Sequence, residues 1–192
     1  MDEMTNFRKN ALLENLCKEW SSMWAACHED KEKLMRLVLM QQSAPYFATF
    51  CNNGKGLSME YCKREFKDYV NGRVFHDCDG VKGYTYAMYV DAPTCVEIGL
   101  DVVQMLWCNN VDVVIPQTKC PVLYVSNHST LNITLDGYNS PKIYLFDDSV
   151  VNIMEGDEES KVVVYKYSKD ARVELGKYCL ASVKVFDKGL RL

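Results

Sequence analysis

A period of about twenty residues runs through the C-terminal third of the chain and constrains its fold more than any other feature. Segments 121–140, 141–160, 161–180 and 181–192, written one under another, place similar apolar residues in shared columns. The predicted columns are Leu123, Ile143, Val163 and Val183; Val125, Leu145, Tyr165 and Val185; Leu131, Val151 and Ala171; and Ile133, Ile153 and Val173. Short alternating segments that repeat at a fixed period are typical of a solenoid of stacked coils.

The columns also predict which side chains enter the core. Alternate side chains of a strand point to opposite faces, so a slip of one residue would bury Lys142, Tyr144 and Asn152 instead. An antiparallel meander also gives regularly spaced alternating strands, but it does not require columns of similar residues. We therefore expect residues 84–192 to form a right-handed, single-stranded parallel β-helix with about twenty residues per coil.

The first seventy-four residues follow helical spacing. Four helices are predicted, over Asn6–Cys27, Lys31–Gln42, Pro45–Cys51 and Met59–Val70. Ser58 is placed to cap the fourth helix, and Asn71-Gly72 is a typical stop for it. The expected fold class is α+β, with a helical bundle domain over 1–74, a linker over 75–83 and the β-helix domain over 84–192.

Composition narrows the classes of function. The formal net charge is −4 and the sequence pI is about 5.4, which gives no global electrostatic reason to bind nucleic acid or an anionic membrane. No apolar run approaches the roughly 20 residues of a membrane span, and the polar N-terminal segment lacks the apolar stretch of a signal peptide. A cytoplasmic location is expected, in which the nine cysteines would be free thiols.

Candidate catalytic and metal-binding residues are sparse. His76-Asp77-Cys78-Asp79 gathers metal-capable side chains, but no second cluster nearby completes a zinc site, so we expect no metal and no cofactor. The acidic run Glu155–Glu159 (with Gly156 within it) is expected at a solvated corner between coils. The cysteines in apolar contexts are expected to be buried and unreactive: Cys17, Cys27, Cys51, Cys62, Cys95 and Cys108. These observations predict that the protein is not an enzyme.

Basic residues concentrate around the fourth predicted helix and leave nucleic-acid binding as an alternative. They are Lys55, Lys63, Arg64, Lys67 and Arg73. The third and fourth predicted helices, joined by a short glycine-containing turn, loosely resemble a helix-turn-helix. Glu60, Glu65 and Asp68 dilute the positive charge of the fourth helix, which argues against that function.

Alternation also predicts an apolar stripe on the outer face of the first strand of each coil. The side chains expected to point outward are Val122, Tyr124, Tyr144, Phe146, Val162, Val164 and Phe186, with Tyr165 and Tyr167 at the adjoining corner. A contiguous apolar surface rich in tyrosine is typical of an interface. The helical domain, a second copy of the chain or another protein could cover this surface. The unpaired strand edge of the last coil is a second predicted site of association.

Several short segments carry a resemblance to a group of proteins. Four of them resemble segments of small proteins carried by phages and mobile elements of gut bacteria. They are Cys17-Lys18-Glu19-Trp20, the run 83–87 (Gly-Tyr-Thr-Tyr-Ala), Thr118-Lys119-Cys120-Pro121 and Tyr144-Leu145-Phe146-Asp147. The stacked body is similar to the parallel β-helices of the bactofilin class, which have no such helical head. The resemblance implies no catalytic residue, and it implies a setting in which small proteins bind, block or scaffold larger host machinery.

The combined expectation is a non-enzymatic protein–protein interaction module, such as a phage or mobile-element accessory protein or inhibitor that binds a host or defence protein. A homodimer is expected. The expected interface residues are Tyr124, Tyr144, Phe146, Tyr165, Tyr167 and Phe186. The alternatives are nucleic-acid binding through the basic helix and sequestration of a small molecule or nucleotide in a groove of the solenoid.

Overall fold

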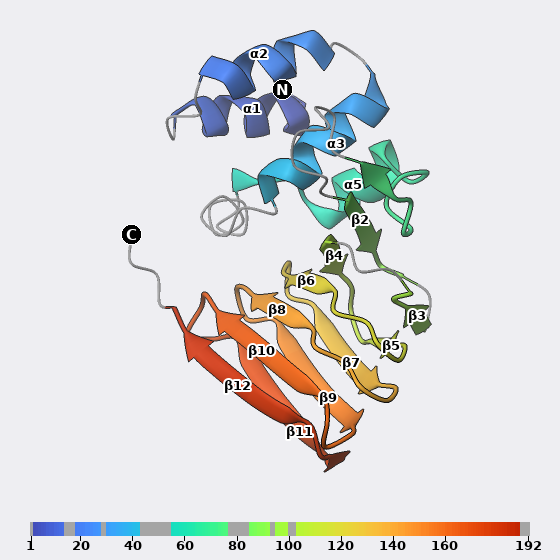
Figure 1. Ribbon diagram of the computed structural model, residues 1–192. Helices are drawn as coiled ribbons and strands as arrows, with labels where there is room; N and C mark the ends of the chain where they lie inside the picture. The colour runs from blue at the N-terminus through green and yellow to red at the C-terminus, as the bar shows by residue number, and fades with distance from the viewer. Residues whose placement is uncertain are drawn as a thin grey trace.

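In the part of the chain that the computed structural model describes, four short helices lie at one end of a β-solenoid of about five turns (Figure 1). The structure describes residues 2–13, 18–27, 30–42, 55–76, 85–92, 95–99 and 103–188. The helices are α1 (Glu3–Leu13), α2 (Lys18–Cys27), α3 (Lys31–Gln42) and α5 (Met59–Glu65). Among the described helices, none has the length and apolar character needed to cross a membrane.

The solenoid consists of two sheets whose strands alternate along the chain. The first sheet has the order β1-β2-β4-β6-β8-β10-β12, with bounds Phe75–His76, Thr85–Val90, Val103–Trp107, Val122–Val125, Lys142–Leu145, Lys161–Lys166 and Ser182–Asp187. The second has the order β3-β5-β7-β9-β11, with bounds Cys95–Glu97, Val111–Ile115, Thr130–Leu135, Val150–Gly156 and Arg172–Cys179. All neighbouring strands are parallel except β1, which pairs antiparallel with β2. The parallel β-helix predicted from the repeat is therefore present.

The predicted columns are confirmed in the middle coils and shift afterwards. Leu123 lies opposite Ile143, but Val164, and not Val163, takes the next place in that column. Consequently Val162 and Val164, which we expected to point outward, are buried at 1% and 0% exposure. The physical cause is a bulge in β9. Ile153 pairs with Ile133 and Glu155 pairs with Thr134, so β9 contains one extra residue between these two pairs. This residue shifts the register of the strands that follow by one and reverses which of their side chains face the core.

The last coil shifts once more. Val173 lies opposite Val151, where the sequence predicted Ala171. Leu175 lies opposite Ile153, where the sequence predicted Val173. Both predicted positions are therefore wrong by two residues. In the first sheet, Tyr165 lies beside Tyr144 and not in the inward column where the sequence placed it. The expected twenty-residue step thus lengthens towards the end of the solenoid.

Two hydrophobic cores result from this arrangement. The first lies between the two sheets and contains the inward columns, including Leu123, Ile143 and Val164. The second lies between the helices and the outer face of the first sheet, and it joins Phe7, Trp24 and Phe66 to Trp107 and other strand residues. The helices thus pack on the outer face of the early coils.

The helical part agrees with the sequence only in outline. The helix over Lys31–Gln42 is confirmed as α3, whereas the single helix predicted over 6–27 is two helices, α1 and α2. The fourth helix, α5, ends at Glu65 instead of Val70. Its predicted cap is confirmed, because Ser58 Oγ accepts a hydrogen bond from the Tyr61 backbone N–H at 3.2 Å.

Some expectations fall on other parts of the chain. The helix predicted over Pro45–Cys51 and residues 77–79 of the histidine-containing cluster lie outside the described residues, as do Cys17 and Cys51. The predicted linker begins with strand β1. Cys27, Cys62 and Cys108 are buried as expected, but Cys95 is exposed because it occupies an outward position of β3.

Candidate functional site

The aromatic stripe predicted from the sequence is a ladder of stacked rings along the first sheet. Ring centroids lie 4.7 Å apart for Tyr124–Tyr144, 5.1 Å for Tyr144–Tyr165 and 5.5 Å for Tyr165–Phe186. A second column runs beside it, in which Phe146 stacks on Tyr167 at 5.2 Å. Parallel strands about 4.8 Å apart hold like residues at stacking distance, so coil repetition itself builds the ladder.

Among the described residues, the helices cover the first part of this ladder most completely. Tyr124 and Phe146 are 6% and 1% exposed and belong to the core beneath the helices. Tyr144, Tyr165 and Tyr167 are half-buried, and Phe186 is 45% exposed. The stripe therefore has a part within the intramolecular core and a part, which we call the open stripe, formed by Tyr165, Tyr167 and Phe186, of which Tyr167 also packs against that core.

The stacking decides what the open stripe can contact. Rings inside the ladder occupy one another's faces, so Tyr165 presents mainly its edge and hydroxyl group, whereas Phe186 ends the ladder and has a described ring on one face alone. Lys188 Nζ lies 5.2 Å from the Tyr165 ring centroid and 5.9 Å from that of Phe186, which adds a cation at the same place. Ring edges, hydroxyl groups and a cation suit a protein surface, whereas the stacking of a nucleobase needs a free ring face, which here the end of the ladder alone offers.

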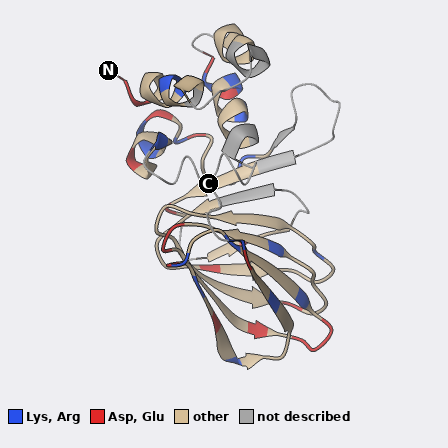
Figure 2. Ribbon diagram, turned by 90° about the vertical axis from the view of Figure 1, so that its left-hand side faces the viewer, with Lys and Arg blue, Asp and Glu red and all other residues tan. Residues whose placement is uncertain are grey.

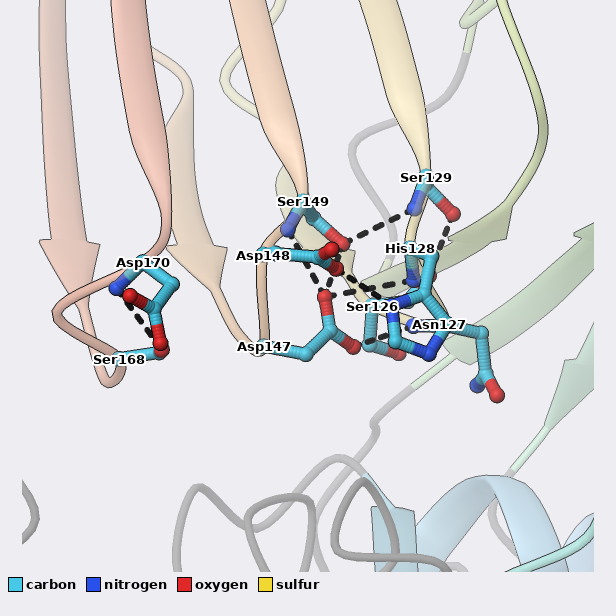
Figure 3. A network of polar contacts seen from close by, with 9 residues as sticks. All are labelled: Ser126, Asn127, His128, Ser129, Asp147, Asp148, Ser149, Ser168 and Asp170. Atoms are coloured by element: carbon cyan, nitrogen blue, oxygen red, sulfur yellow. Dashed lines mark hydrogen bonds and ion pairs between the residues drawn. The ribbon is translucent and has the colours of Figure 1, made fainter.

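A polar network occupies the corner between the first and second strands of neighbouring coils (Figure 3). The Asp147 carboxylate accepts hydrogen bonds from the backbone N–H groups of Asn127 at 2.6 Å, Ser149 at 2.9 Å and His128 at 3.3 Å. Asn127, His128 and Asp147 all have positive φ, a conformation that Asn and Asp tolerate better than most residues. The corner thus joins successive coils through one carboxylate.

His128 and Asp148 form an exposed ion pair within the same corner. The hydrogen bond to Asp148 raises the pKa of His128, and the same bond lowers the pKa of Asp148. Burial raises the pKa of Asp147, and its hydrogen bonds with Ser149, Asn127 and His128 act in the opposite direction. The candidate residues predicted from the sequence do not include His128, although its spacing of twenty residues from Asp148 equals the coil period and is the signal that predicts the pair.

The same three side chains bring potential metal-ligand atoms within 4.8 Å of one another. Asp147 is already occupied by the backbone donors of the corner, which leaves His128 and Asp148 as side chains able to turn towards a cation. Two protein ligands are fewer than the four of a structural zinc site or the three of a catalytic one. The corner is therefore a structural joint between coils.

Basic and acidic residues are interspersed in the helical part of the molecule (Figure 2), and three basic residues of the alternative nucleic-acid site form ion pairs. Lys63 pairs with Asp91, Arg64 Nε lies 2.9 Å from Glu65, and Arg73 lies 2.7 Å from Glu32. Lys67 and Lys55 are exposed. These ion pairs compensate much of the positive charge that the sequence concentrates here.

A shallow cavity of about 420 Å³ lies on the second sheet of the solenoid. Its lining includes three carboxylate side chains, Asp136, Glu155 and Asp157, together with Tyr178 and Leu180, and no lysine or arginine. Carboxylates repel phosphate groups, so this cavity does not suit a nucleotide. Asp157, Glu158 and Glu159 are exposed at the corner, as the sequence predicted for this acidic run.

Comparison of the chain with models of protein families, with curated proteins and with solved structures found no match.

Proposed function

We propose that this protein is a non-enzymatic binding module that contacts a protein partner through the open stripe. The observation that carries the proposal is the partial cover of the aromatic ladder, which passes from 6% exposure at Tyr124 to 45% at Phe186 along one continuous face. Coil repetition extends the ladder past the described helices, and the rings at its end are accessible to a partner. Tyrosine and phenylalanine are enriched at protein interfaces because they bury a large rigid area.

The resemblance to phage and mobile-element proteins supports a more specific form of the proposal. In that form, the partner is a host or defence protein that this chain blocks or scaffolds. The open stripe combines tyrosine hydroxyl groups with the Lys188 ammonium group, so the complementary surface would be apolar with acceptor groups at its rim.

The test replaces one ring of the open stripe and one exposed ring elsewhere. Tyr165→Ala removes the central ring, and Tyr138→Ala removes a ring that is 42% exposed at a different corner of the solenoid. Tagged proteins are incubated with bacterial lysate and the captured proteins are quantified by mass spectrometry. We expect at least one protein to be captured by the wild type and by Tyr138→Ala and to be reduced about 30-fold or more by Tyr165→Ala, the usual effect of a hot-spot residue.

Equal capture by all three proteins, with unchanged thermal stability, would contradict the proposal.

Nucleic-acid binding through Lys63, Arg64 and Lys67 remains the alternative, and a gel-shift titration at two salt concentrations tests it. Phosphate contacts must weaken as the salt concentration rises, whereas we expect no shift at either concentration because acidic residues pair with Lys63 and Arg64.

A further inference from the structure

The last described coil leaves the core of the solenoid open. The column Leu123, Ile143, Val164 is fully buried, yet its next member, Val185, is 45% exposed. The column Val113, Ile133, Ile153 is also fully buried, and its next member, Leu175, is 58% exposed. Two core columns thus end in exposed apolar side chains at the same end of the molecule.

The same end exposes strand edges. Among the described strands, β12 is the outer strand of the first sheet and β11 the outer strand of the second (Figure 1). The backbone N–H groups of Ser182 and Lys188 donate to the carbonyl oxygens of Ser160, directly before β10, and of Lys166 in β10. Since backbone groups alternate along a strand, those of Val183, Val185 and Asp187 point away from β10, to the side where no described strand lies. Such an edge is a template for another strand.

We infer that this end of the solenoid binds the same end of a second copy of the chain, with β12 pairing antiparallel to the partner's β12 about a two-fold axis at Val185. In this register Val185 faces the partner's Val185 as a hydrogen-bonded pair, and Val183 faces the partner's Asp187. Continuity of the core requires inward residues to face inward residues, and Val183 and Val185 extend the inward positions of Val162 and Val164. The dimer closes both core columns of each copy.

Like-charge contacts of Lys184 disfavour the two registers in which the residue before or after Val185 lies on the two-fold axis. With Val185 on the axis, Lys184 lies opposite the partner's Phe186, and the reciprocal pair gives a second cation–aromatic contact. A shift that places Lys184 on the axis sets it against the partner's Lys184. A shift that places Phe186 on the axis sets Lys184 against the partner's Lys188. Both of those registers oppose like charges directly across a strand pair, which is destabilising.

The helices limit the assembly to two copies. At the other end of the solenoid, β1 pairs with the edge of β2, and Met88, Val90 and Trp107 lie in the core beneath the helices. A tail-to-tail contact is isologous and therefore closes after two copies. This surface shares Phe186 with the open stripe, but Val185 and Leu175, which carry the inference, lie outside the stripe, so the inference does not rest on the proposed partner-binding function.

The experiment measures molar mass by size-exclusion chromatography with light scattering at loading concentrations from about 5 to 100 µM, a range that brackets a micromolar Kd. We expect the wild type to reach twice the 22.0 kDa of the chain. Val185→Lys places a charge at the end of the core column, and Val185→Pro removes an N–H group that points away from β10. Both should be monomers, whereas the control Tyr138→Lys, which changes a similarly exposed side chain elsewhere, should remain dimeric.

A cross-linking variant reports the contact without destabilising the fold. Antiparallel hydrogen-bonded pairs have Cα atoms about 5.5 Å apart, which is within the range for a disulfide. Oxidised Val185→Cys should therefore yield a tryptic peptide joined to its own copy through residue 185, and the wild type cannot. A monomeric wild type, or a dimer that both Val185→Lys and Val185→Pro leave intact, would overturn the inference. So would dimerisation only after deletion of Gly189–Leu192, which would show that those residues cover the open end.

Discussion

The backbone N–H of Asn127 donates to Asp147 Oδ2 at 2.6 Å, and this bond joins two coils at their corner. Ser129 N in turn donates to Ser149 Oγ at 3.0 Å, so two successive hydrogen bonds connect the same pair of corners. Both acceptors are side chains twenty residues further along the chain. The repeat therefore stabilises the corners through side chains, in addition to the backbone ladders of the strands.

Asp147→Ala should destabilise the protein much more than Asp148→Ala. The first substitution leaves backbone donors of Asn127 and His128 without their acceptor at a partly buried corner, at a cost of about 1–3 kcal/mol. The second removes only the exposed pair with His128, which is expected to cost about 0.5 kcal/mol or less. Urea unfolding curves of both variants measure the difference. Equal losses would show that the corner is held by other contacts.

The His128–Asp148 pair should titrate measurably. The pKa of His128 is raised in the folded state, so its contribution to stability is present below about pH 6.5 and is lost as pH rises through the folded-state value. The pKa of Asp148 is lowered, so its contribution is present above about pH 4 and is lost as pH falls through its folded-state value. The pair therefore stabilises between these limits. NMR titration should show the pKa of His128 fall in Asp148→Asn, and an unchanged value would refute the pairing.

The sequence predicted the coils up to β8 and failed at β10 for a local reason. The run Val162-Val163-Val164-Tyr165 is apolar at every position, so alternation alone cannot choose which valines face inward. The register is instead set upstream by the bulge in β9, and one inserted residue there has no distinct composition. The cover of Tyr124 by the helices depends on contacts distant in sequence, which a periodic pattern does not encode.

Gly176→Ala should destabilise the protein while Gly99→Ala should not. A Cβ atom at Gly176 would lie 2.4 Å from the Met154 carbonyl oxygen, so the backbone of β11 or β9 would have to move, at a cost of about 1–3 kcal/mol. A Cβ atom at Gly99 would meet nothing within 4 Å, and the expected change is within about 0.5 kcal/mol. Thermal unfolding compares the two. A neutral Gly176→Ala would mean that β11 is not held closely against β9.

A ladder of polar side chains on the second sheet ends in a mismatch that one substitution should repair. Asn132 Nδ2 donates to Asp112 Oδ1 at 2.9 Å, and Asn152 Nδ2 donates to Asn132 Oδ1 at 2.8 Å. Asn152 Oδ1 is buried and has no hydrogen-bond donor among the described residues. The residue opposite it in the next strand is Glu174, whose ionised carboxylate can only accept.

Glu174→Asn would place an amide donor at the next position of that ladder. Because the new bond would satisfy a buried acceptor, we expect the variant to be more stable than Glu174→Ala by about 1 kcal/mol. Glu174→Ala is the matched control, since it removes the same carboxylate without supplying a donor. Chemical denaturation of both variants at neutral pH provides the measurement. If Glu174→Asn is no more stable than Glu174→Ala, the Asn152 oxygen is satisfied by water and the ladder ends without an energetic cost.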